Sequence, residues 1–158
     1  MQDKFDEYLK DKEKPTRLKA LTAKSYRNLN HALEDSDTNS TLATYGDAIL
    51  KLAYCKILFD EGETKITERK QALESDKNLV EVIAKRYDLL NYIKFDNNDT
   101  KIPQDYKYQK PQKGKDSPSK YIATAVEALI AAIYLDNDED LDLVVDIVKD
   151  WRELIENK

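Results

Sequence analysis

Residues that interrupt regular secondary structure are scarce in this chain. It contains three glycines and four prolines among 158 residues, and polar and apolar residues do not alternate along it as amphipathic strands require. Apolar residues recur instead at helical spacing. The sequence contains no run of 18 consecutive apolar residues, the length that a helix needs to cross a membrane. The sequence therefore predicts an all-α protein, and the absence of an apolar leader favours the cytoplasm.

The expected helices follow from apolar periodicity and from the turn residues between them. We expect helices at residues 3–13, 16–33, 42–58, 67–73, 79–87, 117–134 and 141–155. The chain is long enough for one core, so we expect a single domain over 1–158 with 42–58 as its central helix. One cysteine is too few for a disulfide framework or a cysteine-based metal site.

The segment 101–120 differs from the rest of the chain in charge. It carries six lysines and two aspartates, although the net charge of the whole chain is -5. A solvated polar loop is one interpretation. The other is an RNA contact, in which lysines bind phosphates while Tyr106, Tyr108 and Tyr121 stack on bases. The candidate RNA-binding residues are Lys107, Lys110, Lys113 and Lys115.

Two acidic residues occupy apolar helical stretches, where burial of a charge is costly. Asp47 lies in ATYGDAILKLAY and Glu127 lies in IATAVEALIAAIY. A carboxylate in each of two core helices indicates a shared site, because buried carboxylates require a partner or a metal ion. Mg²⁺ prefers oxygen ligands of this kind. Alternatively, each acid lies at a helix edge and pairs with a lysine such as Lys51 or Lys120.

Four ordered blocks of this sequence resemble the ribonuclease III family. They are ALTAKSY (20–26), TNSTLATYGDAIL (38–50), ITERKQALES (66–75) and SKYIATAVEALIAAIYLD (119–136). The corresponding family patterns are ALTHxSY, NERLEFLGDAVL, LTxLRxxLVS and KxxADxxEALIGAIYLD. The resemblance covers about 140 residues. It implies the helical bundle of the ribonuclease III endonuclease domain, a homodimer, and Mg²⁺-dependent hydrolysis of double-stranded RNA, with Mn²⁺ as a possible substitute.

The resemblance also assigns site residues, and some of them depart from the family pattern. Asp47 and Glu127 match catalytic metal ligands, and Glu61 is a weaker match to a further ligand. Ala43 and Thr124 stand where the family has the other two of its four carboxylates. Asn39, Lys120 and Thr124 are expected to support the site. We considered Glu34, Asp35 and Asp37 as acids that could move in from the preceding turn.

These departures leave the expected activity open between three interpretations. The first is a short, nuclease-only ribonuclease III without a separate RNA-binding domain, which cleaves structured RNA such as ribosomal precursors. The second is an inactive RNA-binding or ribosome-associated scaffold that keeps the fold. The third is a helical interaction domain with no role on RNA. A heterodimer with an intact paralogue could also complete the site.

Overall fold

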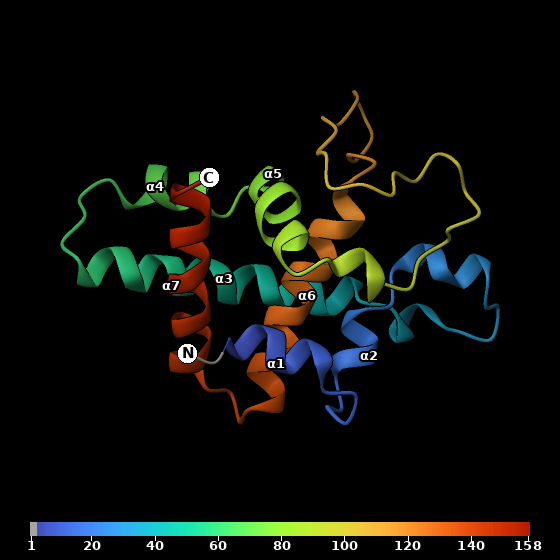
Figure 1. Cartoon of the computed structure of the whole chain (residues 1–158), viewed down its shortest axis with the longest axis horizontal. Helices are drawn as coiled ribbons and strands as arrows, with labels where there is room; N and C mark the ends of the chain where they lie inside the picture. The colour runs from blue at the N-terminus through green and yellow to red at the C-terminus, as the bar shows by residue number, and fades with distance from the viewer. Residues whose placement is uncertain (1–2) are drawn as a thin grey trace.

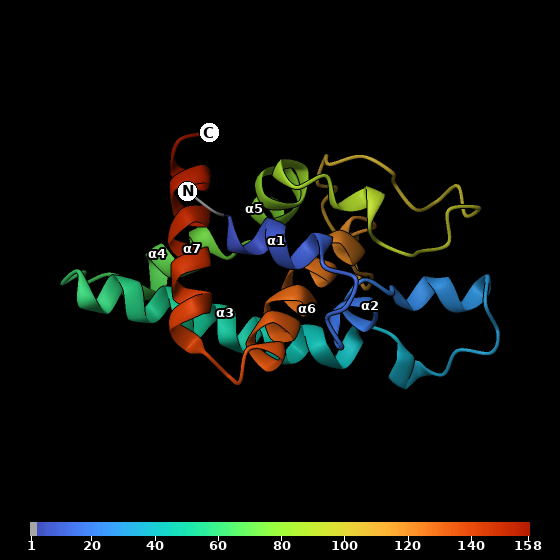
Figure 2. The same ribbon diagram turned by 60° about the horizontal axis from the view of Figure 1, so that its bottom comes forward.

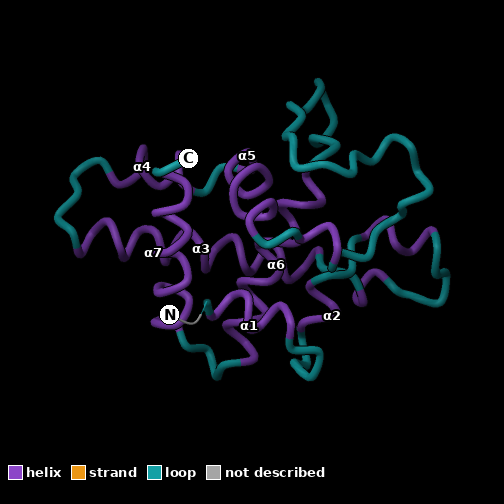
Figure 3. The backbone as a smooth tube through the Cα atoms, viewed as in Figure 1, coloured by secondary structure: helices purple, strands orange, loops and turns teal. Residues whose placement is uncertain are grey.

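The regular secondary structure of residues 3–158, the part of the chain that a computed structural model describes, is helical. Figure 3 shows helices and loops and no strand over these residues, which confirms the all-α prediction. None of the helices in this range is long and apolar enough to cross a membrane. The α-helices are α1 (Lys4–Lys10), α2 (Arg17–Ala20), α3 (Ser40–Asp60), α4 (Ile66–Leu73), α5 (Asp76–Asn78), α6 (Lys120–Asp136) and α7 (Leu141–Glu156). A π-helix (Leu79–Ala84) continues α5, and 3-10 turns lie at Lys24–Asn28, Asp35–Asp37 and Leu89–Asn91.

The centre of the fold is the crossing of α3 and α6. Figures 1 and 2 show α6 enclosed by α3, α1, α7 and the helix that α5 begins. Ten of the 17 residues of α6 are buried, five of them alanines. A helix that is apolar on most sides is stable only when other helices cover it, and small side chains let those helices approach closely. The composition of α6 therefore explains its central place.

The N-terminal segment is held against the end of α6 by one carboxylate. Asp136 accepts hydrogen bonds from the Tyr8 hydroxyl at 2.7 Å, the Thr16 hydroxyl at 2.6 Å and the Thr16 amide at 3.0 Å. Phe5 of α1 lies against Trp151 of α7, with ring centroids 5.1 Å apart. These contacts join α1, α6 and α7 around the same core.

The predicted helix at 16–33 is wrong, because the chain leaves helical geometry after α2. The amide of Lys94 donates to Leu21 O at 2.7 Å, and the amide of Ala23 donates to Lys94 O at 2.8 Å. The amide of Asn39 donates to Thr22 O at 2.9 Å. Backbone groups that a continuous helix would pair internally are thus paired with distant segments, which local periodicity does not reveal.

Candidate active site

A glycine sets how closely the two central helices approach. A Cβ atom placed on Gly46 of α3 would lie 1.7 Å from the carbonyl oxygen of Glu127 in α6. No larger residue fits there without moving one of the helices. Gly46 therefore lets α3 touch the backbone of α6 at Glu127, and it places Asp47 next to that residue.

Asp47 and Glu127 line one cleft, as the pattern of carboxylates in two core helices predicted. The cleft has a volume of ≈ 490 Å³ and both carboxylates are half-buried in its wall. Its lining residues come from α3, α5 and α6: Ser40, Ala43, Thr44, Asp47, Lys51, Asp76, Lys120, Thr124 and Glu127. The structure thus brings together the two acids and two of the three supporting residues that the sequence singled out.

Asp47 is ion-paired within the cleft. The ammonium group of Lys51, one turn further along α3, lies 2.5 Å from Asp47 Oδ2. Partial burial acts to raise the pKa of Asp47, but hydrogen bonds with Glu127 and Lys51 outweigh it and hold the pKa below its usual range. Asp47 is therefore an ionised carboxylate that already has a cation beside it. Both interpretations of Asp47 from the sequence, a shared site and a lysine pair, describe part of this arrangement.

Glu127 is the opposite case, a carboxyl group that retains its proton. Burial, together with the hydrogen bond and the negative charge of Asp47, raises its pKa to about 9. At neutral pH the neutral Glu127 carboxyl donates its proton to the hydrogen bond with ionised Asp47. One negative charge is then shared between two carboxyl groups, and Lys51 balances it.

The positions of the two missing carboxylates lie in the same cleft. Ala43 is buried in its wall, and Thr124 stands one turn before Glu127 on α6. Over residues 3–158 no three His, Cys, Asp or Glu side chains are arranged to hold one metal ion. With Ala43 and Thr124 in place of two expected carboxylates and Asp47 paired to Lys51, the residues of this chain do not fit the divalent ions that the resemblance implies.

Two charged residues of the cleft, Lys51 and Asp76, were not assigned a role at the site from the sequence. Asp76 follows the N-cap Ser75 at the start of α5, and its negative charge contributes to the raised pKa of Glu127. It directly follows the motif ITERKQALES, but nothing in the spacing indicates that this end of the motif faces α6. Lys51 was considered only as a surface partner of Asp47.

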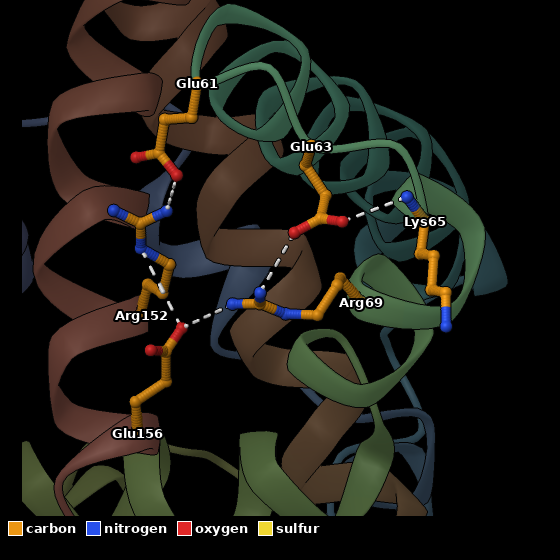
Figure 4. A network of polar contacts seen from close by, with 6 residues as sticks. All are labelled: Glu61, Glu63, Lys65, Arg69, Arg152 and Glu156. Atoms are coloured by element: carbon orange, nitrogen blue, oxygen red, sulfur yellow. Dashed lines mark hydrogen bonds and ion pairs between the residues drawn. The ribbon is translucent and has the colours of Figure 1, made fainter.

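Asn39 and Glu61, both assigned from the resemblance, lie outside this cleft. Asn39 is buried and donates from Nδ2 to Ala20 O at 3.0 Å, so it ties the start of α3 to the end of α2. Glu61 follows α3, 14 residues after Asp47, which is roughly 20 Å along a helix. Its carboxylate accepts a hydrogen bond from Arg152 at 2.6 Å, and Figure 4 shows it turned toward α7.

The network in Figure 4 explains the place of Glu61 in the fold. Arg152 of α7 pairs with Glu61, and Arg69 of α4 bridges Glu63 and Glu156 at 3.2 Å each. The network connects the end of α3 to α4 and α7. Within one chain Glu61 therefore stabilises the helix arrangement and does not reach Asp47. The acids Glu34, Asp35 and Asp37 are exposed, and none of them lines the cleft.

The lysine-rich segment projects as a long loop between the 3-10 turn at Leu89–Asn91 and α6 (Figure 1). Its predicted RNA-binding residues are all exposed: Lys107, Lys110, Lys113 and Lys115. Stacking of its tyrosines on bases stays a prediction, and the structure shows their contacts within the protein. Tyr106 donates to Asp88 at 2.6 Å and accepts from the amide of Leu90, and Tyr108 and Tyr121 pack against the core. The tyrosines anchor the loop, and these four lysines do not line the cleft, whereas Lys120 at the end of the segment does.

Comparisons with known proteins agree with this geometry. The family model of the ribonuclease III domain matches residues 40–138. Ribonuclease 3 of Natranaerobius thermophilus is 31% identical over 165 aligned positions, which cover 100% of this chain and 64% of that protein. Ribonuclease 3 of Clostridium tetani is 33% identical over 87% of this chain and 53% of that protein. The chain thus spans between half and two thirds of the length of these curated relatives.

A solved structure shares the fold over nearly its whole length. The nuclease domain of ribonuclease III from Campylobacter jejuni superposes with a TM-score of 0.67 at 25% identity, covering 98% of this chain and 96% of that chain. That structure is described as flexible in a region involved in dimer formation. Fold and sequence therefore point to the same family.

Proposed function

Because the chain belongs to the ribonuclease III family, we propose that it acts on double-stranded RNA, the substrate class of that family. The observation that carries this proposal is the cleft between α3 and α6. Three residues of the family motifs, Asp47, Lys120 and Glu127, line that cleft together. The role we propose is in the processing of structured RNA, for example of ribosomal precursors.

The chemistry of the cleft favours binding of RNA over hydrolysis by this chain alone. In the family, divalent ions activate the attacking water and stabilise the charge that develops on the phosphate. The cleft here lacks two of the expected carboxylates, and its remaining ionised one is paired with Lys51. The ammonium groups of Lys51 and Lys120 suit a phosphodiester, because phosphate contacts supply most of the affinity of proteins for nucleic acids.

The proposal is tested by separating binding from cleavage on the same RNA. End-labelled duplex RNA is titrated with purified protein in EDTA, in Mg²⁺ and in Mn²⁺, and each mixture is examined by native gel and by denaturing gel. We expect a shifted complex in all three conditions and intact RNA strands. Duplex RNA that does not bind in any condition would refute the proposed function.

Endoribonuclease activity is the second candidate. The observation in its favour is that Asp47 and Glu127 keep the neighbouring positions that the family site requires, across the contact made by Gly46. This candidate predicts metal-dependent cleavage that both Asp47→Asn and Glu127→Gln abolish. Cleavage by the wild type that survives both substitutions would indicate a contaminating nuclease.

A substitution of Lys51 distinguishes RNA binding from endoribonuclease activity through metal affinity, without an activity assay. If its ammonium group occupies the cation position beside Asp47, then Lys51→Met should increase the affinity for Mn²⁺, measured by electron paramagnetic resonance of the free ion. Lys56→Met is the matched control, because Lys56 forms an equivalent ion pair with Asp60 on the same helix, outside the cleft. Equal Mn²⁺ affinity in the wild type and in both variants would show that Lys51 does not replace a metal ion.

We also propose that the protein forms a homodimer through α3. Tyr45, Leu52 and Phe59 are exposed by 42%, 53% and 74%, and their seven-residue spacing places them on one face of the helix. An exposed apolar stripe of this kind is typical of an association surface. The same surface could accept an intact paralogue in place of a second copy, which would add one complete site to the assembly.

A further inference from the structure

A basic hollow lies on the segment between α2 and α3. It has a volume of ≈ 440 Å³ and six lining residues: Lys24, Ser25, Arg27, Asn28, His31 and Leu33. Three of these residues are basic and none is acidic, although the chain as a whole has a net charge of -5. A concentration of positive charge on an acidic protein marks a place where an anion is preferentially bound.

This hollow is connected to the cleft by a third one. The connecting hollow, of ≈ 400 Å³, shares Lys24 and Ser25 with the basic hollow and shares Ser40, Lys120 and Thr124 with the cleft. The three hollows therefore adjoin one another in a row from Glu127 to His31. We call this row the α3–α6 groove.

The lining of the α3–α6 groove matches the chemistry of a sugar-phosphate backbone. Its connecting hollow is lined by the hydroxyl-bearing residues Ser40, Ser117 and Thr124 and by Lys24 and Lys120. Asp116 is the one acid that lines the connecting hollow. Ammonium groups pair with phosphates, and hydroxyl groups can bond to phosphate oxygens and to the 2′-hydroxyl of a ribose.

The basic end of the groove is held in place by contacts with the body of the protein. Ser25 Oγ accepts a hydrogen bond from the amide of Asp96 at 3.0 Å, and Asn28 donates to the carboxylate of Asp96 at 3.1 Å. Arg27 donates to Leu33 O at 3.3 Å and lies 3.5 Å from Asp35. The segment that carries Lys24 is thus held against the body of the protein by the residues on the C-terminal side of Lys24.

We propose that the α3–α6 groove holds one RNA strand and that Lys24, Arg27 and His31 form a second phosphate-binding site beyond the cleft. This inference rests on the proposed function and extends it: the backbone of the strand continues from Lys120 past Ser40 and Ser25 to the basic hollow. Lys107, Lys110, Lys113 and Lys115 of the lysine-rich loop do not line this path, whereas Ser117 and Lys120 at the end of that segment do.

Charge reversal at Lys24 tests the proposal. Lys24 is exposed, and no hydrogen bond or ion pair of its side chain is found over residues 3–158, so Lys24→Glu should fold normally. The matched control is Lys149→Glu on the exposed side of α7, at the opposite end of the molecule (Figure 1). Affinity for a duplex RNA is measured for both variants and the wild type over a series of KCl concentrations in EDTA, and circular dichroism checks that both variants are folded.

We expect Lys24→Glu to weaken binding at least about tenfold and to reduce the slope of log K against log salt by about one, because one phosphate contact is lost. Lys24→Arg should retain the affinity, and Lys149→Glu should change it less than about twofold, as expected for a charge outside the groove. If the wild type binds RNA and Lys24→Glu and Lys149→Glu change the RNA affinity equally, the proposal that the groove binds RNA is refuted. The proposed function is then unaffected. A wild type that binds poly-glutamate and not RNA would overturn both.

Discussion

Substitution of Gly46 by alanine should separate the two central helices. The added Cβ would lie 1.7 Å from the Glu127 carbonyl oxygen and 3.3 Å from the Ala131 amide nitrogen. Carbon atoms do not approach a backbone oxygen closer than about 3 Å, so the helices must move apart by more than about 1 Å. That shift breaks close packing along the most buried helix of the fold. We expect a loss of about 3 kcal/mol or more in the free energy of unfolding, a large part of the total for a domain of this size.

Urea unfolding followed by tryptophan fluorescence measures this loss. Trp151 is the single tryptophan of the chain and is fully buried, so its emission reports on the core. Gly62→Ala is the control, because Gly62 has a φ of 78° and nothing within 4 Å of its added Cβ. It should cost only about 1 kcal/mol, the strain of a left-handed backbone. Equal destabilisation by the two substitutions would refute the argument that steric contact with Glu127 limits residue 46.

Three further predictions concern the protonated carboxyl, the N-terminal clamp and the dimer. Because the pKa of Glu127 is about 9 in the folded protein, above the usual value of 4.5, stability should fall as the pH rises from about 4.5 to 9. Glu127→Gln should flatten this dependence in urea unfolding with EDTA present; parallel curves would contradict it. Asp136→Asn removes a charged acceptor of three hydrogen bonds and should cost about 1–3 kcal/mol in the same assay; an unchanged midpoint would show that the clamp is dispensable. Leu52→Glu should convert a dimer of twice 18.3 kDa to a monomer in light scattering, whereas Leu18→Glu, at an equally exposed position on α2, should not; a wild type that is already monomeric would exclude the interface.

Much of the fold could be predicted from local sequence alone. Apolar periodicity located α3, α6 and α7 to within a few residues, because a helix that must bury one side carries that requirement in its own sequence. The failure at 16–33 has an equally physical cause. Backbone groups around Thr22 are paired with Lys94 and Asn39, which are distant in the chain, and no local pattern encodes such partners.

The sequence predicted where the candidate site lies, but it did not predict the charge states of the residues in it. The cost of a carboxylate in an apolar helix indicated Asp47 and Glu127, and the resemblance indicated what Ala43 and Thr124 had replaced. The sequence alone determined which residues could be present at the site. Only the tertiary structure decided that Asp76 faces it, that Lys51 neutralises Asp47 and that Glu127 retains a proton, because a pKa depends on burial and on charges brought close by the crossing of α3 and α6.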